Sequence, residues 1–277
     1  MSDLNYKKTD VARFWNDNPC GSRLGNGAEP GTSEFFDRTE VERYEREPFI
    51  AEFAKFEQWR GKKVLEVGCG MGTDLSMFAR HGAQTWGVDL TPASAAIAAR
   101  RLAHHGIEPR ITVGDSELLP FPDGFFDLVY SWGVIHHTPD TPTAARELLR
   151  VARPNGKVLA MIYNRRSLVA LQAYLLYGLF RGKPFVPVKE IIAANLESPG
   201  TKAYTVQEAR ELFAGLLDIR VTPVLTPYDL RIGRDRFVPS WFGFLIPPQF
   251  GYFMVIEGIK PDTAASRNIE TSMNSRG

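Results

Sequence analysis

The chain has 277 residues, and its 33 Lys and Arg against 32 Asp and Glu give a formal net charge of +1 at pH 7. That balance disfavours a general attraction to nucleic acid or to an anionic membrane. The hydrophobic fraction of 44% is ordinary for a globular protein. Two cysteines, Cys20 and Cys69, are too few for a disulfide framework, and no run of ~18 apolar residues predicts integral membrane association. We therefore expect a cytoplasmic protein with one elaborated domain.

Changes in composition divide the chain into regions. A polar N-terminal extension of short helices, residues 1–59, is expected to act as a lid, and it ends in a predicted amphipathic helix from Pro48 to Trp59. The main domain follows at residues 60–260, and a flexible tail at residues 261–277. Within the main domain, about residues 165–204 interrupt the pattern as an inserted helical cap, called the insertion below.

From residue 64 onwards, short apolar runs alternate with helical segments. The predicted strands are 64–67, a run ending at Val88, 111–113, 126–131 and 157–163, and the predicted helices are 73–80, a segment from Thr91 to just before Gly106, and one beginning at Thr141. In the last two helices, a Thr-Pro pair supplies the N-cap and the first helical residue. Strands that alternate with helices form parallel βαβ units, so the fold class is α/β with a doubly wound, mostly parallel sheet.

The insertion carries a strongly apolar helix from Leu168 to Phe180. After it, the main domain resumes with a helix that a Thr-x-x-Glu capping box begins and with two strands, at residues 205–214, 218–224 and 253–259. The apolar helix and the aromatic segment 241–245 have two interpretations, which the sequence leaves open. They either belong to the core or face a lipophilic acceptor or a membrane surface.

A glycine-rich turn follows the first predicted strand, in the run VLEVGCGMGTD from Val64 to Asp74. Gly68, Gly70 and Gly72 lie where the strand passes into a helix, so the backbone can approach a ligand closely and present its amides. Their spacing is G-x-G-x-G, whereas the dinucleotide fingerprint of oxidoreductases is G-x-G-x-x-G. The turn predicts a nucleotide-like ligand and disfavours an NAD-dependent oxidoreductase.

Two further carboxylates end the next two strands. Asp89 can accept hydrogen bonds from a ribose diol, and Asp115 with the backbone of Ser116 can border an adenine edge. Ligands of open α/β sheets bind at these carboxyl ends of the strands. The three motifs together therefore indicate one nucleotide site.

The sequence resembles the class I S-adenosylmethionine-dependent methyltransferases, and among them the group similar to menaquinone and ubiquinone biosynthesis C-methyltransferases. Four runs carry the resemblance in order: VLEVGCGMGTD, WGVDLTP, VGDSELLPFPDGFFDLVYSWGVIHHTPD and ELLRVARPNGKVLAMIYN. It implies a Rossmann-like methyltransferase fold, whose seven-stranded sheet has an antiparallel final strand. It also implies S-adenosyl-L-methionine as cofactor and S-adenosyl-L-homocysteine as product.

The resemblance also assigns roles to individual residues. It implies that Gly68, Gly70 and Gly72 surround the methionine moiety, with Glu66 close to that group. Asp89 and the adjoining Leu90 would hold the ribose, and Asp115 and Ser116 the adenine. Ser131, at the end of the fourth strand, would border the sulfonium. The cofactor-binding residues that the resemblance implies are therefore Glu66, Gly68, Gly70, Gly72, Asp89, Leu90, Asp115, Ser116 and Ser131.

His136 and His137 are the candidates for a catalytic base. An imidazole titrates near neutral pH and can deprotonate a hydroxyl, a thiol or an acidic carbon. Alternatively, the pair only shapes its loop. We expect no metal site, because adjacent residues rarely point to one ion and no third ligand is evident.

The sequence thus predicts an enzyme that transfers a methyl group to carbon, oxygen, nitrogen or sulfur of a small, partly apolar acceptor by in-line displacement. The alternative is a protein of the same fold that binds S-adenosylmethionine in a non-methylating or non-catalytic role. We expect a small-molecule partner and no nucleic acid, while peripheral membrane contact stays open. The oligomeric state and the acceptor are not predicted.

Overall fold

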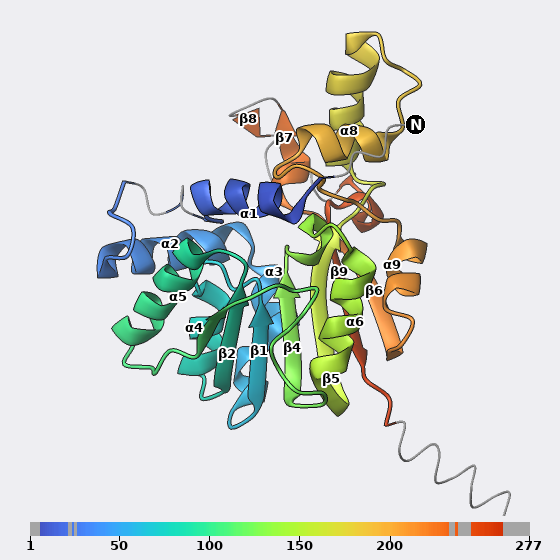
Figure 1. Ribbon diagram of the computed structural model, residues 1–277. Coiled ribbons are helices and arrows are strands. Elements are labelled where there is room, and N and C mark those ends of the chain that lie inside the picture. Colours follow the sequence, from blue (N-terminus) through green and yellow to red (C-terminus); the bar gives the residue numbers. More distant parts are fainter. Residues whose placement is uncertain (1–5, 22–23, 25–26, 233–235, 238–244, 263–277) are drawn as a thin grey trace, which may run out of the picture.

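The computed structural model describes residues 6–21, 24, 27–232, 236–237 and 245–262. Its centre is a seven-stranded sheet with helices on both faces (Figure 1). In the order in which they pair, the strands are β3 (Ile111–Val113), β2 (Gln84–Asp89), β1 (Lys63–Val67), β4 (Phe126–Trp132), β5 (Ala152–Tyr163), β9 (Phe253–Ile259) and β6 (Leu217–Val224). β9 runs antiparallel to both of its neighbours, and the pairs among the first five strands are parallel. The predicted sheet with an antiparallel final strand is confirmed.

Helices cover the sheet in two layers, and each layer buries alternate residues of the same strand. Val129 of β4 belongs to a hydrophobic cluster with Leu148, whereas Leu128 and Tyr130 belong to a second cluster with Phe78 on the other face. This alternation is the side-chain period of a strand that is buried on both faces. The helices that supply the two layers include α6 (Thr141–Val151), α9 (Val206–Leu212), α3 (Phe49–Ala54) and α4 (Thr73–Arg80).

The N-terminal extension lies over the carboxyl ends of the central strands (Figure 1). It includes α1 (Lys8–Asp17) and α2 (Ser33–Arg46), and α2 packs against α3, α4 and α5 (Pro92–His104). The strand order reverses between β1 and β4, so their carboxyl ends diverge and leave a crevice. α1 closes over that crevice.

The predicted helix from Pro48 to Trp59 is wrong as one element. α3 ends at Ala54, Lys55 adopts a left-handed conformation with φ 48°, and a 3₁₀ turn, η1 (Phe56–Trp59), follows. Trp59 Nε1 donates to the Ala54 carbonyl at 2.9 Å, which stabilises this tight turn. Apolar spacing alone does not reveal such a break, because both pieces still pack on the same face.

Two boundaries also differ from the sequence prediction. The N-cap of α6 is Asp140 instead of Thr141, since the Asp140 carboxylate accepts a hydrogen bond from Thr143 N at 3.0 Å. β5 begins at Ala152, five residues before the predicted start. Ala152 pairs with Phe126 and Lys157 with Leu128, so the expected turn lies inside the strand as a bulge.

The insertion is also more irregular than predicted. In place of one helix from Leu168 to Phe180, it has α7 (Leu168–Ala173), a π-helical turn η3 (Tyr174–Gly178) and a 3₁₀ turn η4 (Leu179–Arg181), followed by α8 (Val188–Asn195). A Cβ on Gly178 would lie 2.8 Å from Ile191 Cδ1. The change of helix type therefore coincides with the close approach of η3 to α8.

Between β6 and β9 the chain forms the 3₁₀ turns η5 (Pro227–Leu230) and η7 (Pro248–Phe250) and a short pair of strands, β7 (Arg231–Ile232) and β8 (Arg236–Phe237). Of the aromatic segment 241–245, only Leu245 lies within the described residues, and it is exposed. Most of the predicted tail lies outside them too, and the predicted region boundaries stay predictions. None of the described helices has the length and apolarity needed to cross a membrane.

Candidate functional site

The glycine turn leaves β1 at the crevice, and its backbone requires glycine. Gly68, Gly70 and Gly72 have φ of +74°, +52° and +74°, a region that other residues rarely adopt. A Cβ on Gly68 would lie 2.2 Å from Val134 Cγ2, and one on Gly72 would lie 3.0 Å from the backbone of Ala98. Gly72 is also the N-cap of α4, so the turn presents amides at a helix N-terminus.

A cleft with about 1160 Å³ of empty space, the open solvent at its mouth included, surrounds this turn. It brings together residues from β1, β2, β4 and α1. The predicted site residues that line it are Glu66, Gly68, Gly70, Asp89, Leu90, Asp115, Ser116 and His137. Gly72, Ser131 and His136 are not among its described lining residues, and Ser131 is fully buried behind it.

Asp89 connects the glycine turn to the second strand. Its Oδ2 accepts a hydrogen bond from Gly70 N at 2.9 Å, and its Oδ1 accepts two from Thr91, N and Oγ1, at 2.9 Å each. Burial raises the pKa of Asp89, and these hydrogen bonds oppose that rise. A carboxylate offers about four acceptor positions, so one remains on Oδ2 for a ligand hydroxyl.

Asp115 lies under α1. Its Oδ2 accepts a hydrogen bond from Lys8 Nζ, and its Oδ1 accepts one from Glu117 N at 2.9 Å. Lys8 also pairs with Glu117 at 2.6 Å. Burial lowers the pKa of Lys8, but the hydrogen bonds and charges of the two carboxylates outweigh that effect and raise it. The expected adenine-side carboxylate therefore also holds the N-terminal extension over the cleft.

Glu66 is a buried carboxylate with an unused oxygen. It is 4% exposed, and its Oε2 finds no hydrogen-bond partner among the described residues. Burial raises its pKa well above the usual value, and the nearby charge of Asp74 adds to the rise. An unsatisfied buried acceptor is costly unless a ligand supplies a donor. Glu66 therefore fits a ligand that brings an N–H or ammonium group.

The comparisons with known proteins fit this geometry. Residues 65–160 match the family model described as a methyltransferase domain, and these residues run from β1 through the glycine turn to β5. Residues 65–160 form a class I S-adenosylmethionine-dependent methyltransferase domain. The matched region contains the predicted site residues Glu66 to Ser131 and both histidines.

Similar proteins extend this match beyond the domain. A probable chloroplastic tocopherol O-methyltransferase of Oryza sativa subsp. japonica is 37% identical over 110 residues, which are 39% of this chain and 30% of that protein. Methyltransferase GfsG of Streptomyces halstedii is 25% identical over 88% of this chain and 85% of its own length. The chain thus spans less than a third of the rice relative but most of the Streptomyces one.

A solved structure has the same fold as the methyltransferase domain and its surroundings. Geranyl diphosphate C-methyltransferase of Streptomyces coelicolor A3(2) superposes with a TM-score of 0.60 at 20% identity, over 94% of this chain and 99% of that one. This likeness covers the N-terminal extension and the insertion as well as the sheet. It concerns the fold alone.

His136 lies beneath the cleft of the methyltransferase domain. It is fully buried, and neither ring nitrogen has a hydrogen-bond partner in the part of the chain that the structure describes. Its ring centroid lies 3.9 Å from that of Tyr163. Burial lowers the pKa of His136 well below its usual value, so the ring is neutral at physiological pH.

His137 lines the cleft, but both of its nitrogens face the insertion. Nδ1 lies 2.9 Å from Ser198 Oγ and 3.0 Å from Thr201 Oγ1, and Nε2 lies 3.2 Å from Glu197 Oε2. Tyr163 OH donates to the same Glu197 oxygen at 2.7 Å. Burial would raise the pKa of Glu197, yet the contacts with His137 and Tyr163 lower it, so the carboxylate is ionised.

Glu197 and Cys20 are two further accessible polar groups close to His137 and the cleft. Glu197 is not among the described residues that line the cleft, but it contacts His137, which does line it, and 41% of its side-chain surface is accessible. Cys20 lines the cleft and is exposed there, and the charges of Arg43, Glu47 and Glu197 act on its thiol.

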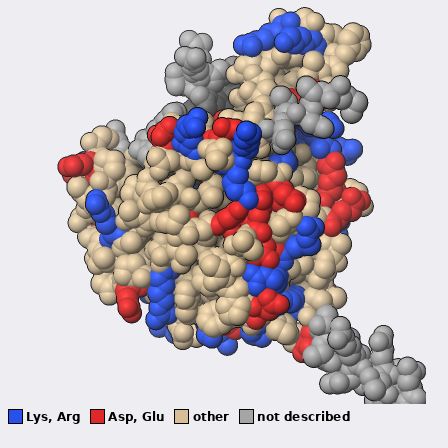
Figure 2. Space-filling model, viewed as in Figure 1, with Lys and Arg blue, Asp and Glu red and all other residues tan. Residues whose placement is uncertain are grey.

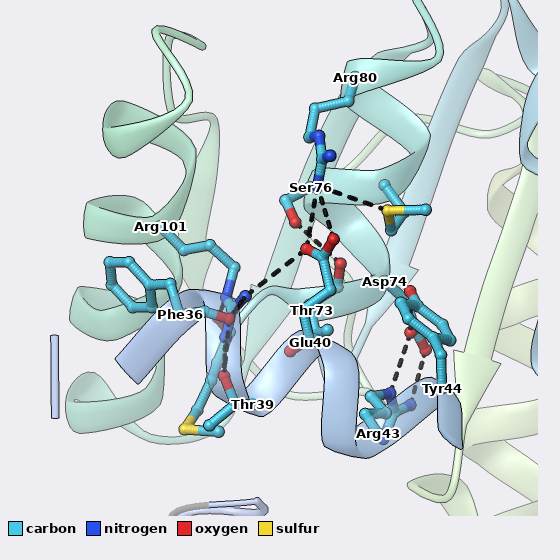
Figure 3. A network of polar contacts seen from close by, with 12 residues as sticks. Phe36, Thr39, Glu40, Arg43, Tyr44, Thr73, Asp74, Ser76, Arg80 and Arg101 are labelled. Atoms are coloured by element: carbon cyan, nitrogen blue, oxygen red, sulfur yellow. Dashed lines mark hydrogen bonds and ion pairs between the residues drawn. The ribbon is translucent and has the colours of Figure 1, made fainter. Parts of the chain in front are cut away.

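A network that the sequence analysis missed ties α2 to the glycine turn (Figure 3). Arg43 of α2 donates to both oxygens of Asp74, from Nε at 3.0 Å and from Nη2 at 2.7 Å. The hydroxyls of Tyr44 and Tyr130 donate to the same carboxylate at 2.9 Å each. Asp74 is buried, but the Arg43 charge and these hydrogen bonds outweigh burial and lower its pKa.

Arg101 forms the second half of this network. It is fully buried, and it donates to Met71 O at 3.0 Å in the glycine turn and to Phe36 O at 3.1 Å and Thr39 Oγ1 at 2.6 Å in α2. Burial lowers its pKa to about 10, so it is charged at neutral pH. Phe36 and Thr39 lie more than sixty residues before Arg101 in the chain, so no local motif reveals these contacts.

Proposed function

We propose that this protein transfers the methyl group of S-adenosylmethionine to a small, partly apolar acceptor. The observation that supports this most directly is the glycine turn of the methyltransferase domain, which Asp89 holds open at the cleft through Gly70 N. The names of the relatives, an O-methyltransferase and a methyltransferase, point in the same direction. The class of acceptor belongs to this proposal, because the match spans only 30% of the rice relative.

We propose that the predicted residues hold the cofactor as follows. The turn at Gly68 to Gly72 and Glu66 would hold the methionine part, Asp89 and Leu90 the ribose, and Asp115 and Ser116 the adenine. The free acceptor position on Asp89 and the unpartnered oxygen of Glu66 support these roles. Ser131 lies behind the cleft, so we propose that it supports the wall near the reacting group.

The cofactor supplies an electrophilic methyl group, and the residues of this chain have two tasks. They align the acceptor with the methyl group, and they exclude water, because positive charge is lost in the displacement. Trp15 of α1 and Trp132 at the end of β4 line the cleft, and Trp15 contacts His137 edge-on at 5.1 Å between ring centroids. These aromatic walls favour a partly apolar acceptor.

For an acceptor that must lose a proton, we propose that Glu197 receives it and that His137, which lines the cleft, connects Glu197 to the acceptor. Glu197 is ionised and accessible, and Tyr163 and His137 fix its position. The proton would move to the Glu197 carboxylate, which becomes a neutral carboxylic acid, while the acceptor atom keeps the electron pair that attacks the methyl group. His136 has no access to the cleft, so we give it a packing role.

Methyl transfer from radiolabelled S-adenosylmethionine tests the proposal. The full chain is assayed against a panel of lipophilic phenols, quinols, amines and thiols. We expect product with at least one class, and a loss of about 10²- to 10⁴-fold in kcat for Glu197→Gln with unchanged cofactor affinity. Tight cofactor binding without transfer to any class would instead favour the non-methylating alternative.

We also propose a reducing, cytoplasmic setting and a small molecule as the partner. Cys20 and Cys69 are both free thiols, which supports a reducing setting. The near-neutral charge of the chain supports a small molecule as the partner over nucleic acid.

A further inference from the structure

The insertion presents large apolar side chains to solvent. Phe180 is 73% exposed and Phe185 is 95% exposed, and the other exposed apolar side chains of this region are Leu171, Leu176 and Leu179. The opposite side of the same segment is well packed, because Ala170, Ala173 and Ile191 are buried. The insertion therefore has an inner face that holds it to the protein and an outer apolar face without described contacts that bury it.

Basic residues accompany this outer face. Residues 167–189 contain Arg181, Lys183 and Lys189 and no Asp or Glu, although the whole chain is nearly neutral. All three are exposed, and no described carboxylate forms an ion pair with them. Figure 2 shows Lys and Arg side chains at the far end of the insertion, next to a broad uncharged surface. Arg181 also stacks over the Tyr177 ring at 5.0 Å.

Apolar side chains beside unpaired basic ones complement one kind of surface in particular. An anionic bilayer accepts aromatic and aliphatic side chains at its interface and attracts Lys and Arg to its headgroups. A protein partner would more often bring its own carboxylates and a shaped apolar pocket. The insertion projects away from the sheet (Figure 1), which suits contact with a planar interface.

We propose that the outer face of the insertion, residues 171–189, docks on an anionic membrane surface. Glu197 lies at the base of the same insertion and contacts the cleft through His137. Docking would therefore bring Glu197 and the adjoining cleft close to the bilayer, where a lipophilic acceptor is concentrated. That consequence rests on the proposed function, but the docking does not.

Vesicle flotation of the full chain tests the docking without any need for activity. We use vesicles of phosphatidylcholine alone and of phosphatidylcholine with phosphatidylglycerol. We expect binding to the anionic vesicles that weakens as salt is added. We expect the double replacement Arg181→Gln and Lys183→Gln to weaken binding to the anionic vesicles about 30-fold, because each charge contributes about fivefold. Phe180→Ser with Phe185→Ser reduces it as well.

Matched controls separate the surface from general charge and apolarity. Lys55→Gln with Lys62→Gln removes two exposed charges outside the insertion, and Phe250→Ser removes an exposed aromatic residue of η7. Both controls are expected to bind as the original chain does. Absence of vesicle binding, equal binding to vesicles of phosphatidylcholine alone, or equal losses in the controls would overturn the proposal. So would a dimer in sedimentation that the Phe180 and Phe185 variants dissociate.

Discussion

At the scale of single residues, the sequence indicated the glycine turn and its acidic neighbours well. Each of these features is local, since a G-x-G-x-G run after a strand and an Asp at the next strand end are visible without the fold. The sequence did not reveal the contacts of Asp74, Arg101 and Glu197 at the site. Their partners come from elements far away in the chain, so their pairing depends on how α2 and the insertion pack.

Asp89 provides the first prediction. Asp89→Ala removes the acceptor for a ribose hydroxyl and for Gly70 N, and we expect the affinity for S-adenosylhomocysteine to fall about tenfold to hundredfold. Calorimetric titration measures it. The control is Glu57→Ala, an exposed carboxylate of η1, and circular dichroism must show that the Asp89 variant is folded. Unchanged affinity in the folded variant would remove Asp89 from the site.

Asp229 provides a prediction on pH. Burial raises its pKa to about 6, although Thr226 N and Tyr252 N donate to it at 2.9 Å each. Because this folded-state pKa lies above the ordinary value of 3.8, the folded protein binds the proton more tightly than the unfolded chain does. The resulting stabilisation is fully present below pH 3.8 and is lost as the pH rises through about 6.

Asp229→Asn should remove this dependence. We expect the difference in free energy of unfolding between the original chain and the variant to change by about 3 kcal/mol from the acidic to the neutral end of that range. Urea unfolding at a series of pH values measures it. A difference that stays constant with pH would show that Asp229 titrates normally.

At the scale of elements, alternating apolar runs predicted the strands and helices of the sheet closely, and α4 has the predicted bounds. The sequence failed where packing changes the backbone inside a run. Lys55 divides the helix after Pro48, and Gly178 lies at the end of a π-helical turn in the insertion. Neither the break at Lys55 nor the π-helical turn alters the apolar spacing from which the helices were predicted.

The docking of α2 gives an element-scale prediction. Arg43→Met leaves the buried Asp74 with two tyrosine hydroxyls but without its counter-charge, and we expect a loss of about 3–5 kcal/mol in stability. Replacing Asp74→Leu as well should restore part of this loss, because no buried charge then remains. Urea unfolding of both single variants and the double variant gives the coupling. Additive effects would mean that the pair is not coupled.

The contact of α1 with Asp115 and Glu117 gives a second prediction at the scale of elements. Lys8→Met should loosen the lid and raise the release rate of S-adenosylhomocysteine about two- to fivefold, a modest effect because Lys8 is partly exposed. Stopped-flow fluorescence of the tryptophans follows release. Lys7→Met, on the neighbouring exposed side chain, is the control. Equal rates in all three proteins would show that Lys8 does not hold the lid.

At the scale of the whole molecule, the class of fold was predictable because βαβ alternation admits few sheet topologies. The antiparallel direction of the final strand came from the family resemblance and not from spacing. The sequence did not predict the position of the insertion relative to the cleft, because its apolar residues fit either a core or an exposed face. The structure buries one side of it and exposes the other.

The central claim is that the cleft binds S-adenosylmethionine. The most direct measurement is calorimetric titration of the full chain with S-adenosylmethionine, S-adenosylhomocysteine and NAD. The glycine spacing and the free acceptor positions of Asp89 and Glu66 predict saturable one-to-one binding of the two sulfur nucleotides and none of NAD. Absence of binding by both sulfur nucleotides, or tighter binding of NAD, would contradict the account.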